Sequence, residues 1–194
     1  MWTRAGSLAN PCTRPRKDDD CGMKALTLWQ PWATLVALGA KKIETRSWGT
    51  TYRGTLAIHA AQNFPQEAKD LVFTEPFYSA LQLPLADNKS EMVALPRGAI
   101  VAVCDIADVR DIVAFENTAK MRKYNFATFC SEYLDLPQEP ELSFGDYTPG
   151  RYAWILENIR ALERPIPCRG YQQLWAVPAD IGKQIAQQLK EQGA

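Results

Sequence analysis

The charged side chains of one short segment, GAKKIETR, are the first candidates for chemistry in this chain. They include Lys41, Glu44 and Arg46. An arginine guanidinium binds a phosphate or a base edge through two parallel hydrogen bonds, and a lysine ammonium supplies a point charge for a phosphate. A carboxylate accepts hydrogen bonds from an exocyclic amine or a ribose hydroxyl. The set therefore suits a nucleotide-sized ligand that has one donor-rich edge and one anionic end.

The strand expected over residues 42–48 decides where these side chains point. Alternation along it places Glu44 and Arg46 on one face, and Ile43 and Thr45 on the other. We expect Ile43 to enter the core, the charged pair to face a cleft, and Lys41 to lean over the same opening from the preceding turn. Two alternatives stay open. Glu44 and Arg46 form a plain structural ion pair, which contributes little where it is exposed, or Lys41 is a solvated turn residue.

Aromatic residues beside arginine or glycine are further candidates, because a loop aromatic can stack on an unpaired base. These are Tyr52 beside Arg53, Tyr152 beside Arg151, and Tyr171 beside Gly170. His59 is the only histidine. Its small alanine neighbours leave room for it to line the cleft, although a partly buried, hydrogen-bonded ring is the simpler interpretation. Trp29 and Trp32 flank a strand–helix turn, and we expect both to pack rather than stack.

The elements that must position these residues are mixed strands and helices. Hydrophobic alternation predicts strands over 24–28, 42–48, 55–61, 98–109, 151–159 and 165–177. Helical spacing and the Pro and Gly positions predict helices over 31–39, 64–81 with a break at Pro76, and 178–194. An irregular helical region is expected at about 112–134, and loops over 84–92 and 136–150. This order predicts an α+β fold, a small and mostly antiparallel β-barrel with flanking helices.

Composition and charge narrow the classes of function. Lys plus Arg and Asp plus Glu are 22 each, so a polyanion must be held by a local cluster rather than by net charge. No apolar run is long enough to cross a membrane. Five scattered cysteines and one histidine form no zinc pattern, so we expect reduced thiols, no metal, no cofactor and a cytoplasmic location. Residues 1–22 are expected to be a disordered tail or an upstream extension, and 23–194 the folded domain.

The segment LWQPWATLVALGAKKIETRSW, followed by YRGTLAIHAA, resembles the opening of the ASCH (activating signal cointegrator homology) domain family. The family's Gly-x-Lys-x-x-Glu-x-Arg element is matched by Gly39, Lys41, Glu44 and Arg46, with QPW before it and YRG after it. Later segments agree in order, and the resemblance covers about residues 24–180. It implies a fold similar to the pseudouridine synthase and archaeosine transglycosylase (PUA) barrel. It also implies nucleic-acid binding in the cleft, with RNA slightly ahead of DNA.

The resemblance also leaves an enzyme class open. Some small ASCH-like proteins are amidohydrolases that deacetylate acetylated cytidine with a lysine and a threonine of this element. Lys41 matches the lysine, but Glu44 stands where the threonine would be, and Thr45 lies on the opposite face. Lys41 and Glu44 can also be considered an acid–base pair for RNA cleavage through the 2′-hydroxyl. A module with a vestigial cleft is a third hypothesis. The missing nucleophile favours a binding module.

Overall fold

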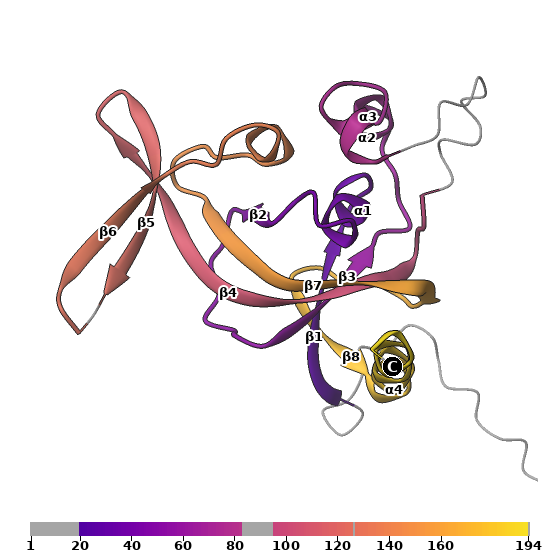
Figure 1. Ribbon diagram of the computed structural model, residues 1–194. Helices are drawn as coiled ribbons and strands as arrows, with labels where there is room; N and C mark the ends of the chain where they lie inside the picture. The colour runs from indigo at the N-terminus through magenta and orange to yellow at the C-terminus, as the bar shows by residue number, and fades with distance from the viewer. Residues whose placement is uncertain (1–19, 83–94, 126, 194) are drawn as a thin grey trace, which may run out of the picture.

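The structure, a computed structural model, describes residues 20–82, 95–125 and 127–193 (Figure 1). Its strands are β1 (Asp20–Leu28), β2 (Ile43–Arg46), β3 (Thr55–Ala60), β4 (Ala99–Phe115), β5 (Thr118–Asn125), β6 (Cys130–Asp135), β7 (Tyr152–Pro167) and β8 (Leu174–Pro178). Its helices are α1 (Trp32–Ala37), α2 (Gln66–Leu71), α3 (Phe77–Ala80), a 3-10 helix η2 (Glu141–Phe144) and α4 (Ala179–Gln192).

The strands form one mixed, mostly antiparallel sheet in the order β2-β7-β4-β3-β1-β8. Only β1 and β3 pair in parallel among the described strands, and the other pairs are antiparallel. The predicted α+β class with flanking helices is therefore confirmed. Within the described part of the chain, no pairing joins β2 to β8. Closure of the sheet into a barrel stays a prediction.

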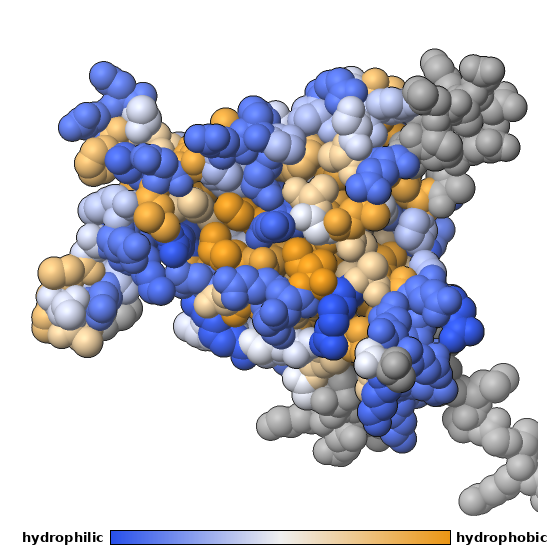
Figure 2. Space-filling view, in the orientation of Figure 1, coloured by the Kyte–Doolittle hydropathy of each residue, from blue (hydrophilic) through white to orange (hydrophobic). Residues whose placement is uncertain are grey.

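Hydrophobic side chains on both faces of the sheet explain where the helices pack. The first half of β4 is buried on both faces, as its run of β-branched and small residues predicts. One core cluster joins α1 to β1, β3, β4 and β7, and a second joins α4 to the opposite side of the same strands. Figure 1 shows this layering, with α1, α2 and α3 above the sheet and α4 below it. Figure 2 shows hydrophobic residues gathered near β2 and β7, with hydrophilic residues around them.

The predicted helical region at 112–134 is wrong. The structure continues β4 to Phe115 and then forms the hairpin β5–β6, which projects from the body in Figure 1. Strand pairing explains the difference: Arg122 of β5 binds Asp111 of β4 at 2.7 Å, and Lys120 pairs with Asp135 of β6 at 3.2 Å. Met121 packs beneath them with Ile112 of β4. Cross-strand pairs of this kind stabilise a polar segment as a strand.

Some of the other predicted boundaries of helices and strands agree with the structure, and others are shifted. Helix α1 follows Pro31 and ends before Gly39, and α3 begins after Pro76, as expected. Strand β7 continues to Pro167, well beyond the predicted end at residue 159. Strand β1 begins at Asp20, so the expected boundary between residues 22 and 23 falls inside it. Residues 1–19 and the expected loop at 84–92 lie outside the described residues.

The structure bears in part on two further expectations, the state of the cysteines and the location of the protein. Cys104, Cys130 and Cys168 are free thiols, as expected. No described helix combines the length and the apolar character that a membrane crossing requires. The cytoplasmic location stays a prediction.

Candidate functional site

The turn between α1 and β2 brings the charged segment to the edge of the sheet. Gly39 adopts a φ of 72°, a left-handed conformation that ends α1 and that glycine adopts without steric cost. Strand β2 then pairs with β7, so that Glu44 lies opposite Trp154 and Arg46 opposite Tyr152. The short edge strand thus presents its charged residues beside the part of β7 that holds the fully buried Ala153 and Trp154.

Lys41 is buried rather than placed over the opening. Its side chain is 1% exposed, and Nζ donates hydrogen bonds to the carbonyl oxygens of Ile43 at 2.5 Å and Phe144 at 2.9 Å. Nζ also lies 3.7 Å from Oε2 of Glu44. Burial lowers the pKa of Lys41, although the Glu44 carboxylate opposes this shift. Lys41 therefore connects β2 to η2 and lies beside the Glu44 carboxylate. The sequence suggested either a position over the cleft opening or a solvated turn, and the structure shows neither.

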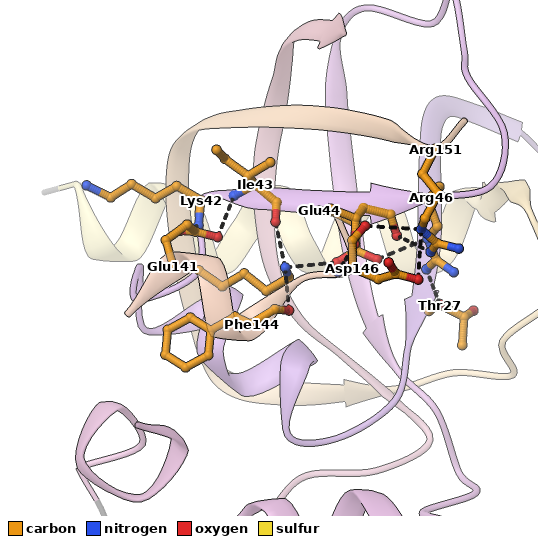
Figure 3. Close-up of polar contacts among 11 residues, drawn as sticks. Thr27, Lys42, Ile43, Glu44, Arg46, Glu141, Phe144, Asp146 and Arg151 are labelled. Atoms are coloured by element: carbon orange, nitrogen blue, oxygen red, sulfur yellow. Dashed lines mark hydrogen bonds and ion pairs between the residues drawn. The ribbon is translucent and has the colours of Figure 1, made fainter. Parts of the chain in front are cut away.

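Glu141 is a second support that the sequence analysis missed. Its two carboxylate oxygens accept hydrogen bonds from the backbone nitrogens of Lys42, at 2.7 Å, and Ile43, at 3.2 Å (Figure 3). Burial raises the pKa of Glu141, and these backbone hydrogen bonds oppose that shift. In Figure 3 the Lys42 side chain points away from the charged cluster. The carboxylate thus fixes the start of β2 from the 3-10 helix.

Glu44 and Arg46 face a cleft, as predicted. Glu44 is 7% exposed. Its Oε1 lies 3.0 Å from Nε of Arg46, and Nη2 of Arg46 donates to the carbonyl oxygen of Thr27 at 3.0 Å. Both side chains line a cleft of about 480 Å³, which we call the first cleft. Thr45 also lines it, although alternation predicts the opposite face, because its hydroxyl turns to accept a hydrogen bond from the backbone nitrogen of Asp146 at 2.9 Å.

A second charged pair, Arg151 and Asp146, lies beside the first pair and also lines the first cleft (Figure 3). Nε of Arg151 lies 3.2 Å from Oδ2 of Asp146, and Nη2 of Arg151 donates to the carbonyl oxygen of Thr45 at 3.4 Å. Hydrogen bonds from Thr148 lower the pKa of Asp146, so its carboxylate is ionised at neutral pH. Arg151 thus lines the first cleft together with Asp146, a residue that the sequence analysis did not name.

A larger cleft adjoins the first, and we call it the second cleft. It has a volume of about 910 Å³ and shares Thr27, Trp29 and Arg46 with the first cleft. Among the lining residues recorded for it, none is an aspartate or a glutamate. Its other charged side chain is Arg169, which lies over the ring of Tyr171 at 5.5 Å. The described linings of the two clefts therefore differ in charge: that of the first holds carboxylates and arginines, and that of the second holds arginines without a carboxylate.

His59 lines the second cleft but is 2% exposed. Its Nε2 bonds the carbonyl oxygen of Cys168 at 2.9 Å, and burial lowers the pKa of the ring. Nδ1 has no hydrogen-bond partner among the described residues. A Cβ added to Gly170 would stand 2.3 Å from the ring, so the loop backbone closes directly over the imidazole. His59 thus combines both interpretations, since it is a buried, hydrogen-bonded ring in the wall of a cleft.

Besides Lys41, three of the predicted residues line neither cleft. The hydroxyl of Tyr52 donates to the carbonyl oxygen of Thr55, and its ring packs against the core. Arg53 donates to two backbone carbonyls of its own loop. Tyr152 packs against Gly49 and the core beneath it. These intramolecular contacts occupy the side chains that the sequence suggested for stacking and phosphate binding.

The sequence predicted that Trp29 packs, but the structure leaves its side chain at the surface. It is 52% exposed and borders both clefts. Trp32, by contrast, packs edge-on against Phe77 at 6.1 Å, as expected, while it also reaches the first cleft. The neighbouring Gln30 is fully buried because its amide binds the backbone of Thr34 and Pro96. These bonds fix the loop in a form that leaves Trp29 at the surface.

The described residues hold no group of three or more His, Cys, Asp or Glu side chains suited to a metal ion. A mixed sheet with helices on both faces, and charged clefts beside its edge strand, define a small α+β domain. The sequence model of the ASCH domain matches residues 26–166. The chain therefore belongs to the ASCH domain family.

The chain is also similar to two longer proteins and to a solved structure. Activating signal cointegrator 1 of Mus musculus and that of Homo sapiens are each 24% identical over 169 residues. The match covers 86% of this chain but only 24% of each relative, so the chain spans about a quarter of those proteins. The crystal structure of the Zymomonas mobilis ASCH protein is 12% identical, with a TM-score of 0.43, and the match covers 85% of this chain and 94% of that one.

Proposed function

We propose that this chain binds nucleic acid, RNA ahead of DNA, and holds a single-stranded or flipped nucleotide at Glu44 and Arg46. The observation that carries the proposal is the first cleft itself. It combines two arginines and two carboxylates with the half-exposed ring of Trp29. Arginine forks bind phosphates and base edges, and an exposed aromatic ring stacks on a base of any sequence.

The carboxylates support a preference for RNA. Glu44 and Asp146 offer acceptor oxygens beside the two arginines, in a cleft otherwise lined largely by apolar residues. A carboxylate repels a phosphate but accepts hydrogen bonds from an exocyclic amine or from a ribose 2′-hydroxyl. The 2′-hydroxyl is absent from DNA. We therefore expect the arginines to supply affinity for both polymers and the carboxylates to discriminate between them.

The surroundings of Lys41 favour binding over hydrolysis. The ammonium is committed to two backbone carbonyls and to Glu44, and it lies outside the lining of both clefts. An acid–base or nucleophilic lysine must reach the reacting atom of its substrate. An amidohydrolase or ribonuclease mechanism based on Lys41 would require that the ammonium leave these partners.

The experiment is a comparison of two charge-removing variants within the same segment. Arg46→Gln removes a cleft cation, and Lys42→Gln removes an exposed cation that points away from the cleft. Affinity for a labelled single-stranded RNA should fall roughly tenfold or more in Arg46→Gln, since a charged hydrogen bond contributes about 1.5–3 kcal/mol. The Lys42→Gln variant should bind within about twofold of the unmodified chain. Equal losses in both variants, at unchanged melting temperatures, would contradict the proposal.

A further inference from the structure

The second cleft has features that the first lacks, and the proposed function does not use them. It is nearly twice as large, at about 910 Å³ against about 480 Å³. Its lining includes Arg46 and Arg169, and three glutamine side chains. Two cations, with no carboxylate among the described lining residues, favour an anion. Primary amides can both donate hydrogen bonds to a sugar or a base and accept them from it. The chemistry of this cleft is therefore that of a sugar-phosphate unit.

Thr27 physically joins the two clefts. Its carbonyl oxygen accepts a hydrogen bond from Arg46, which also lines the first cleft. Its hydroxyl donates to the carbonyl oxygen of Tyr171 at 2.8 Å and accepts from Nε1 of Trp175 at 3.1 Å. One strand residue thus positions an arginine at the boundary and also the loop over 168–173 that walls the second cleft. Trp29 stands at the same boundary, half exposed.

We propose that the two clefts are consecutive subsites for one strand, and that the smallest well-bound ligand is a dinucleotide with an internal phosphate, not a free nucleoside. This inference rests on the proposed function. One nucleoside enters the first cleft, where the carboxylates accept hydrogen bonds from the exocyclic amine of its base or from its ribose. The phosphate that follows lies against Arg46 and Arg169, and the next nucleotide lies in the second cleft. Trp29 at the boundary stacks on a base of this pair.

The division of charge argues for this order of subsites. A phosphate in the first cleft would meet Glu44 and Asp146, whereas the described lining of the second cleft offers arginines and no carboxylate. Arg46 lines both clefts, and its Nε pairs with Glu44. Its other N–H donors can therefore bind a phosphate at the boundary between the clefts. A free nucleoside carries no phosphate and so could not add a charged hydrogen bond from these arginines.

The test is a ligand-length series measured by quenching of tryptophan fluorescence. The ligands are adenosine, cytidine, their 5′-monophosphates, and the dinucleotides ApA and CpC. The better dinucleotide should bind at least about tenfold more tightly than its nucleoside, which corresponds to one charged hydrogen bond. Arg169→Gln should remove most of that gain while nucleoside affinity changes by less than about twofold. Lys183→Gln, which removes an exposed cation of α4, is the matched control and should leave the whole series unchanged.

Each outcome decides the question. Equal affinity for nucleosides and dinucleotides would overturn the subsite while a single-nucleotide site at the first cleft stands. Equal losses for both ligands in Arg169→Gln, or the same loss in Lys183→Gln, would also overturn it. Absence of binding by every ligand in the series and by longer single strands would overturn the proposed function, and the subsite with it. Melting temperatures of the variants exclude unfolding as the cause of a loss.

Discussion

Replacement of Lys41 by methionine tests the structural role that burial assigns to this residue. Methionine keeps most of the buried apolar stem but removes the ammonium, which is 1% exposed and has partners in Ile43, Phe144 and Glu44. Each carbonyl left without a donor costs about 1–3 kcal/mol. Removal of one partner from a buried ion pair costs about 3–5 kcal/mol as a whole. Part of this loss is offset, because the desolvation of the ammonium is no longer required.

We therefore expect Lys41→Met to lower the free energy of unfolding by about 3–5 kcal/mol. With an m-value of roughly 2 kcal/mol/M, the urea midpoint should fall by about 1.5–2.5 M. Addition of Glu44→Gln neutralises the remaining carboxylate. The double variant should be more stable than the sum of the two single effects predicts, by about 0.5–3 kcal/mol. Far-UV circular dichroism in urea, for all four proteins, gives both numbers.

Two outcomes would refute this reasoning. A loss of less than about 1 kcal/mol in Lys41→Met would mean that the ammonium is not committed to the buried carbonyls. Strict additivity of the two substitutions would mean that Lys41 and Glu44 do not interact. Lys42→Gln is the control for charge removal, because Lys42 is exposed and adjacent.

Two predictions concern the clefts more directly. His59 is the only histidine, so a single imidazole C2–H signal in the NMR spectrum reports its titration. The pKa of His59 in the folded protein should lie below 6.5, because burial disfavours the charged ring. As the pH falls below 6.5, the histidine of the unfolded chain is protonated before that of the folded chain, so acidification should lower the free energy of unfolding. This contribution should be absent in His59→Gln. A folded-state pKa above 6.5 would contradict the prediction. Trp29→Ala should weaken RNA binding by about 1–3 kcal/mol with an unchanged melting temperature, because the ring is 52% exposed. Trp32→Ala should lower the melting temperature, since that ring packs on Phe77; the reverse pattern would contradict both assignments.

The sequence predicted the elements whose signals are local. The Pro31 and Gly39 positions marked α1, the break at Pro76 marked α3, and the β-branched run marked β4. Alternation also placed Glu44 and Arg46 at a cleft. These features depend on spacing over a few residues, which sequence alone contains.

The features that the sequence missed depend on distant partners. Lys41 can be buried because the carbonyl oxygen of Phe144, 103 residues away in the chain, accepts a hydrogen bond from its ammonium. Trp29 borders two clefts because walls from η2 and from the loop over 168–173 meet beside it. The polar segment of β5 becomes a strand because β4 and β6 pair with it. No local pattern encodes such contacts, so propensity and periodicity favoured a helix at residues 112–134, and the sequence placed Lys41 over the opening of the cleft or in a solvated turn.

The salt dependence of affinity for a labelled single-stranded RNA tests the central claim most directly. The chain has no net charge, and the proposed site offers Arg46, Arg151 and Arg169. We therefore predict measurable binding at low salt, with log affinity falling against log salt at a slope of about −1.4 to −2.1, which corresponds to two or three phosphates on a single strand. No binding at low salt, or a slope that corresponds to many phosphates, would contradict the account.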